Sequence, residues 1–185
     1  MPVSMRTHFV LAMSILVSIS VLQPPSLWSV ARKPPNADVA AELDAAKAEA
    51  AELARDADEM TALIRSDTSW QSHADVLTRI KEHVNNMGKL VAKLQEERDE
   101  ASPWQQQAID RMIPMLKEIA ANTTAAIDHL NTNHVRPVSG NYKDYLEENA
   151  YTSHELADMI YSFEQYDHTR TKLEQLQDRL ELPSS

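Results

Sequence analysis

The sequence predicts an all-α protein, an antiparallel up-down-up-down four-helix bundle with a long C-terminal helix, preceded by a signal peptide. Only 2 of the 185 residues are glycine, which leaves few positions suited to tight turns. Three long segments repeat apolar residues at alternating steps of three and four, the spacing of a buried stripe on a bundle helix. The first 31 residues follow a different pattern.

Residues 1–31 have the features of a signal peptide. Arg6 precedes a largely apolar run of about 14 residues, from Phe9 to Leu22, and small residues lie near Ala31. A membrane-spanning helix needs about 20 apolar residues, so we expect no stable membrane span after cleavage. We therefore expect an exported protein, periplasmic or secreted, with residues 32–36 as a short linker. The sequence leaves open whether the segment is cleaved after Ala31 or retained.

Three helices are expected over residues 37–65, 69–100 and 103–131, each with one apolar stripe. Pro103 suits a first helical turn, and the short links before the second and third helices make neighbouring helices antiparallel. The stripes are Val39, Leu43, Ala46, Ala50, Leu53, Ala57, Met60 and Ile64; then His73, Leu77, Ile80, Val84, Met87, Val91 and Leu94; then Ile109, Met112, Leu116, Ile119, Thr123, Ala126 and Leu130.

A fourth helix is expected over residues 141–182, which ends the bundle domain at residues 37–182 and leaves 183–185 as a tail. It exceeds the other helices by roughly 18 Å at 1.5 Å per residue. Because Leu173, Leu176 and Leu180 lie in this excess, we predict that its end pairs with its copy in a dimer or bends back near Asp167 onto the bundle. The expected inward-facing set is Tyr145, Leu146, Leu156, Ile160, Phe163, Leu173, Leu176 and Leu180.

Composition and charge exclude several classes of function. A net charge of −10 is unfavourable for binding nucleic acid or anionic lipid. The absence of cysteine excludes disulfides, thiolate metal sites, iron–sulfur clusters and thiol catalysis. The chain also lacks a glycine-rich phosphate loop and the Glu-x-x-His pair of di-iron bundles, so catalysis is the least supported class.

One layer of the expected bundle is an alternative metal or haem site. Folding the second and third helices about their link places Gly88 opposite Met115, beside Pro114, and both glycine and proline disfavour a helix interior. The side chains expected near this layer are His83, Met87, Met115, His154, Asp158 and Met159. They offer nitrogen, sulfur and oxygen ligands for copper, zinc, iron or haem. Methionine is also the usual filler of irregular core gaps, and we expect no cofactor.

Two features instead favour a surface for a partner. Tyr151 and Tyr161 fall off the apolar stripe of the last helix, and tyrosine offers a large contact area at small entropic cost. The loop at 131–141 carries His134 and Arg136, and long loops frequently hold binding residues. The expectation is an exported helical-bundle binding module that presents helix surfaces to a protein partner or to its own copy.

Overall fold

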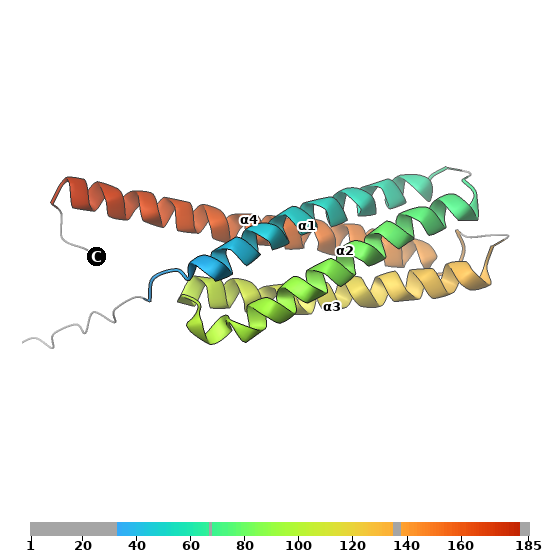
Figure 1. The fold of residues 1–185 in the computed structure, drawn as a ribbon. Helices are drawn as coiled ribbons and strands as arrows, with labels where there is room; N and C mark the ends of the chain where they lie inside the picture. The colour runs from blue at the N-terminus through green and yellow to red at the C-terminus, as the bar shows by residue number, and fades with distance from the viewer. Residues whose placement is uncertain (1–32, 67, 135–137, 182–185) are drawn as a thin grey trace, which may run out of the picture. The chain divides into compact units, whose positions relative to one another are not determined.

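The computed structural model describes residues 33–66, 68–134 and 138–181, and these form an all-α four-helix bundle (Figure 1). Within them lie α1 (Ala37–Leu63), α2 (Trp70–Glu96), the short 3-10 helix η1 (Arg98–Glu100), α3 (Pro103–Thr132) and α4 (Tyr142–Arg179). The predicted fold class is therefore confirmed. The expected signal peptide and the tail at 183–185 lie outside the described residues.

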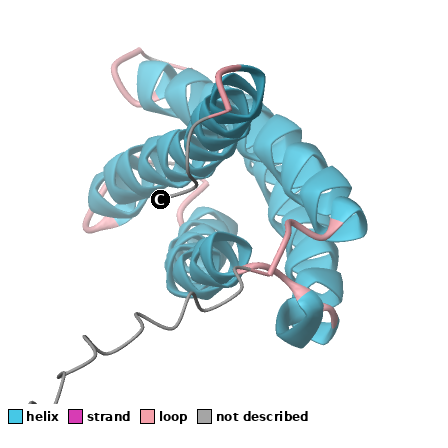
Figure 2. Ribbon diagram, turned by 90° about the vertical axis from the view of Figure 1, so that its left-hand side faces the viewer, coloured by secondary structure: helices cyan, strands magenta, loops and turns pink. Residues whose placement is uncertain are grey.

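The four helices form a closed ring of antiparallel neighbours. α1 packs against α2 and α4, and α3 packs against the same two helices from the other side (Figure 2). Each long helix thus meets the helices before and after it in sequence, and the last meets the first. This is the up-down-up-down connectivity that short links produce.

The core is the set of apolar stripes that the spacing predicts. Every predicted stripe residue of α1, α2 and α3 is buried except Ile64 and Val84, which are half-buried. In α4 the buried members are Leu146, Leu156 and Ile160, and Tyr142 adds a fully buried ring. Burying each large apolar side chain contributes about 1.5–3 kcal/mol, so this shared core holds the bundle together without disulfides.

The helix ends follow local chemistry, and two of them differ from the expected bounds by three residues or more. The side chain of Asn36 caps α1 by accepting the Asp38 N–H at 2.9 Å. The second helix ends at Glu96 rather than residue 100, and the chain tightens into η1 before it reaches Ser102, the extended N-cap of α3. α4 ends at Arg179 instead of residue 182, where Glu181 takes a positive φ of 54°.

The last part of α4 projects beyond the other helices, at the left of Figure 1. Its last buried residue is Ile160, and Lys47 of α1 binds Glu164 at 2.7 Å close to where the two helices separate. The helix continues unbroken through Asp167, so the predicted bend back onto the bundle is wrong. None of the described helices is long and apolar enough to cross a membrane.

The apolar residues at the end of α4 lie on a different face from its core stripe. The 20 residues from Ile160 to Leu180 make about 5.6 turns, which places Leu180 roughly 160° around the helix from Ile160. Leu173, Leu176 and Leu180 are 54%, 40% and 61% exposed. Placing them in the inward-facing set was therefore wrong, because the apolar stripe changes face near Tyr166.

Candidate functional site

A groove opens between α3 and α4 at the point where α4 leaves the bundle. It has a volume of about 500 Å³. The first turns of α3 form one wall and the residues around Phe163 form the other. We call it the α3/α4 groove, and its lining residues are Pro103, Trp104, Gln107, Arg111, Met159, Ser162, Phe163 and Tyr166.

Aromatic side chains give the α3/α4 groove a rigid apolar floor. The rings of Trp104 and Phe163 stack with centroids 6.5 Å apart and an angle of 21° between their planes. The Arg111 guanidinium lies 5.7 Å from the centre of the Phe163 ring, in cation–π contact. The Trp104 indole nitrogen is buried without a hydrogen-bond partner among the described residues. The groove therefore combines aromatic area with one cation.

The groove continues into an exposed apolar stripe along the end of α4. Three α4 residues that line the groove begin a series at alternating steps of three and four, the spacing of a coiled-coil seam. We call this series the outer stripe. It consists of Met159, Ser162, Tyr166, Thr169, Leu173, Leu176 and Leu180. Tyr166 is 52% exposed, and beyond it the three leucines have no cover from the described helices.

Basic side chains flank this surface although the whole chain is acidic. Lys172 and Arg179 each directly precede a stripe leucine, and Arg111 stands in the groove. None of the three forms an ion pair with a described residue. The acidic Glu174 and Asp178 lie farther round the helix from the outer stripe. One edge of the stripe is therefore positive at its C-terminal end, at Lys172 and Arg179, whereas the exposed Asp158 precedes Met159 at its start.

The residues that sequence reasoning chose for a partner surface lie elsewhere. Tyr151 and Tyr161 are 63% and 55% exposed, but neither belongs to the outer stripe or lines the groove. His134 is exposed and stacks on Trp70 with ring centroids 4.4 Å apart, at the opposite end of the bundle. Arg136 lies outside the described residues. The signal that would have found the groove is the seam spacing that starts at Met159.

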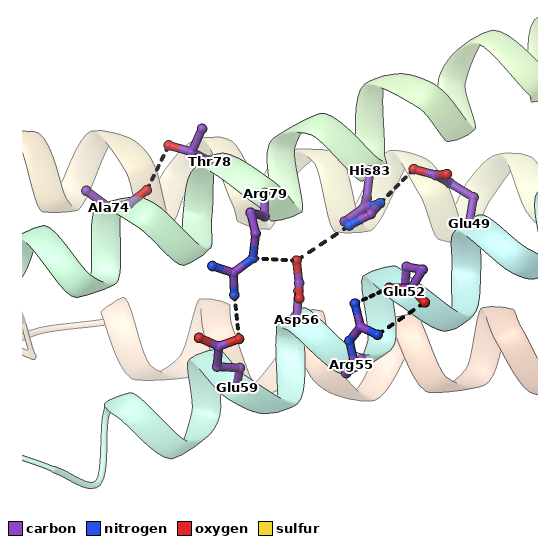
Figure 3. A network of polar contacts seen from close by, with 9 residues as sticks. All are labelled: Glu49, Glu52, Arg55, Asp56, Glu59, Ala74, Thr78, Arg79 and His83. Atoms are coloured by element: carbon purple, nitrogen blue, oxygen red, sulfur yellow. Dashed lines mark hydrogen bonds and ion pairs between the residues drawn. The ribbon is translucent and has the colours of Figure 1, made fainter.

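The structure does not bring the two candidate metal-binding histidines together. His83 of α2 faces α1, with Nδ1 2.7 Å from a Glu49 oxygen and Nε2 3.5 Å from Asp56 (Figure 3). His154 of α4 contacts Asp58 of α1 at 2.9 Å, across the other interface of α1. No group of three or more His, Asp or Glu suited to a metal occurs among the described residues.

The other members of the predicted metal layer differ in their burial. Met87 is fully buried and Met159 nearly so, whereas Met115 is half-buried and Asp158 is exposed. A Cβ built on Gly88 would meet no atom within 4 Å, so no close contact requires a glycine at this position. The metal or haem site stays a prediction that no observation of this structure favours.

The residues around His83 form a polar network that connects α2 to α1 (Figure 3). The Asp56 carboxylate is 4% exposed and accepts a hydrogen bond from Arg79 Nε at 3.0 Å. Arg79 also pairs with Glu59. Hydrogen bonds to Asp56, and then to Glu59, raise the pKa of Arg79. Each charge has an opposite partner, which is the arrangement of a structural contact between helices.

A second polar cluster closes the end of the bundle beneath the loop before α4. The fully buried His73 contacts the Tyr142 hydroxyl through Nδ1 at 3.1 Å, and His129 stacks on the Tyr142 ring. Burial lowers the pKa of His73 and raises that of Tyr142. Both groups are therefore neutral near pH 7, as expected of a hydrogen-bonded core pair.

Comparisons with known proteins give no family or homologue. No protein-family model matches the chain, and no curated protein or solved structure matches it. Function must therefore be argued from the groove and the outer stripe.

Proposed function

We propose that this protein is an exported binding module that recognises a helical segment of another protein along the α3/α4 groove and the outer stripe of α4. The observation that carries the proposal is the exposed face of α4 from the groove to Leu180, which presents Tyr166 and three leucines. Its leucines are 40–61% exposed on a face that the bundle core does not use.

The spacing of the outer stripe specifies the shape of the ligand. Residues at alternating steps of three and four pack best against a second helix, whose side chains fit between them. The stacked Trp104 and Phe163 rings supply a pre-ordered aromatic anchor at one end, and buried aromatic residues dominate many protein interfaces. An extended peptide would leave the seam half-filled, so a helical ligand fits this surface best.

The unsupported length of α4 also favours a bound partner. Isolated helices shorter than about 12–15 residues are marginal in water, because tertiary packing supplies most helical stability. From Tyr166 to Arg179, α4 lacks a buried apolar residue. A partner helix on the outer stripe would supply the missing contacts.

Site-specific photo-cross-linking tests the proposal in the organism that makes the protein. A photoreactive phenylalanine at position 166 is expected to form an adduct with one discrete protein, and the same group at position 151 is the matched control. Both native residues are tyrosines of α4, 52% and 63% exposed. The Leu173→Gln/Leu176→Gln variant is expected to lose the adduct. Equal adducts from both positions, or none from position 166, would contradict the proposal, and an adduct of twice the chain mass would identify a second copy.

A further inference from the structure

We infer that the partner helix carries acidic residues along the edge of its apolar face that meets Lys172 and Arg179. This inference rests on the proposed function and adds the charge of the ligand to it. In coiled-coil pairing the residues beside the seam set the choice of partner, because they face the flanks of the opposite helix. Here one flank holds Lys172 and Arg179, and the groove that continues the seam holds Arg111.

These cations have no carboxylate partner among the described residues, a property that they share with Lys81, Lys89 and Lys117. Lys47, Lys93, Arg79 and Arg98 each form an ion pair within the described residues. Arg111, Lys172 and Arg179 form none there, although the chain carries 28 acidic residues against 18 basic ones. Three unpaired cations beside an unpaired apolar seam are complementary to an amphipathic helix with glutamate or aspartate at its flanking positions.

The same charges make the α4 end of a second copy a poor occupant. Lys172 and Arg179 each lie one residue before a stripe residue, and they are seven residues apart. Residues at this spacing lie on the same edge of the seam. In an antiparallel pair of α4 ends, these two cations would face their own counterparts. In a parallel pair Lys172 would face Gln177, which offers no charge. An acidic-flanked helix is favoured over both arrangements.

Two fluorescent peptides of three heptads test this inference on the exported full-length product. Both have leucine at the seam positions, and they differ only in glutamate or lysine at the flanking positions. Fluorescence anisotropy is expected to give a dissociation constant roughly tenfold lower for the glutamate peptide, since a few rim ion pairs act together. The Lys172→Glu/Arg179→Glu variant is expected to reverse that preference. The Lys117→Glu/Lys143→Glu variant has the same net charge change away from the stripe and is expected to keep it.

Each other outcome overturns the inference in a distinguishable way. If both peptides bind equally and the Leu173→Gln/Leu176→Gln variant abolishes that binding, the inference of an acidic partner is wrong but the proposed function still holds. No peptide binding, with a dimer in sedimentation that the same leucine variant dissociates, would identify a second copy as the occupant. Leucine-dependent binding to vesicles of phosphatidylglycerol and phosphatidylcholine, without peptide binding, would identify a lipid surface. No binding and a monomer would overturn both the inference and the proposed function.

Discussion

Replacing Arg79 by methionine tests whether the polar network between α1 and α2 contributes to stability. Methionine keeps much of the apolar stem of arginine but removes the donor that binds Asp56 at 3.0 Å. The Asp56 carboxylate, 4% exposed, would then retain His83 Nε2 at 3.5 Å in place of the guanidinium donor. Few water molecules can reach it, so the lost hydrogen bond is not fully replaced.

The expected loss follows from the burial of the two partners. Removing a hydrogen bond to a charged buried group costs about 1.5–3 kcal/mol. Arg79 is 41% exposed and Glu59 is 51% exposed, so the bond between these two adds little. We expect the Arg79→Met variant to lose about 2 kcal/mol of unfolding free energy, toward the lower half of that range because water reaches the arginine.

Urea denaturation followed by circular dichroism measures this loss. Arg55→Met is the matched control, because Arg55 and its partner Glu52 are 69% and 45% exposed and their pair is worth about 0.5 kcal/mol or less. A double-mutant cycle of Arg79→Met with Asp56→Ala is expected to give a coupling energy of about 1.5 kcal/mol. Additive single effects, or an Arg79→Met loss no larger than the Arg55→Met loss, would refute the argument.

Three further predictions concern a glycine, a histidine and the N-terminal segment. Gly88→Ala is expected to raise the unfolding free energy by about 0.5–1 kcal/mol, because its Cβ would meet no atom within 4 Å. Gly140→Ala is expected to lower the unfolding free energy, because this residue has a φ of +55°. A loss of unfolding free energy for Gly88→Ala in urea denaturation would show that Gly88 has a packing role. Burial lowers the pKa of His73, so the unfolded chain binds a proton at this residue more readily than the folded protein does. The unfolding free energy is therefore expected to fall as the pH falls below about 6.5, by at most about 1.4 kcal/mol per pH unit from this residue. Urea denaturation between pH 7 and 5 should show a shallower pH dependence in His73→Gln, and an unchanged slope would contradict this assignment. An intact mass that lacks residues 1–31 would identify this segment as a cleaved signal peptide, and a retained Met1 would show that the segment is kept.

Most of the bundle could be predicted because its apolar residues repeat with helical spacing. The stripe from Ile109 to Leu130 is buried at every predicted position, since one period fixes one face of a helix. The spacing alone does not determine which face of a helix turns toward the core when its apolar residues move from one face to another along the helix. Ile160 and Leu173 both looked inward-facing for that reason, although they lie on different sides of α4.

The candidate site was harder to predict because it depends on contacts between distant residues. Trp104 and Phe163 are 59 positions apart in the sequence, and only the packing of α3 on α4 makes them stack. Likewise, the heights of His83 and His154 were estimated from helix register, which does not determine the direction of each side chain. The structure turns them toward two different interfaces of α1.

Hydrogen–deuterium exchange of the backbone amides tests the docking surface most directly. In the free protein, amides from Tyr166 to Arg179 are expected to exchange much faster than those from Tyr142 to Ile160, because only the segment from Tyr142 to Ile160 packs on the bundle. Adding the glutamate-flanked peptide is expected to slow exchange at 166–179 and leave 142–160 unchanged. Unaltered exchange at 166–179 with saturating peptide, or slowing confined to other helices, would contradict the account.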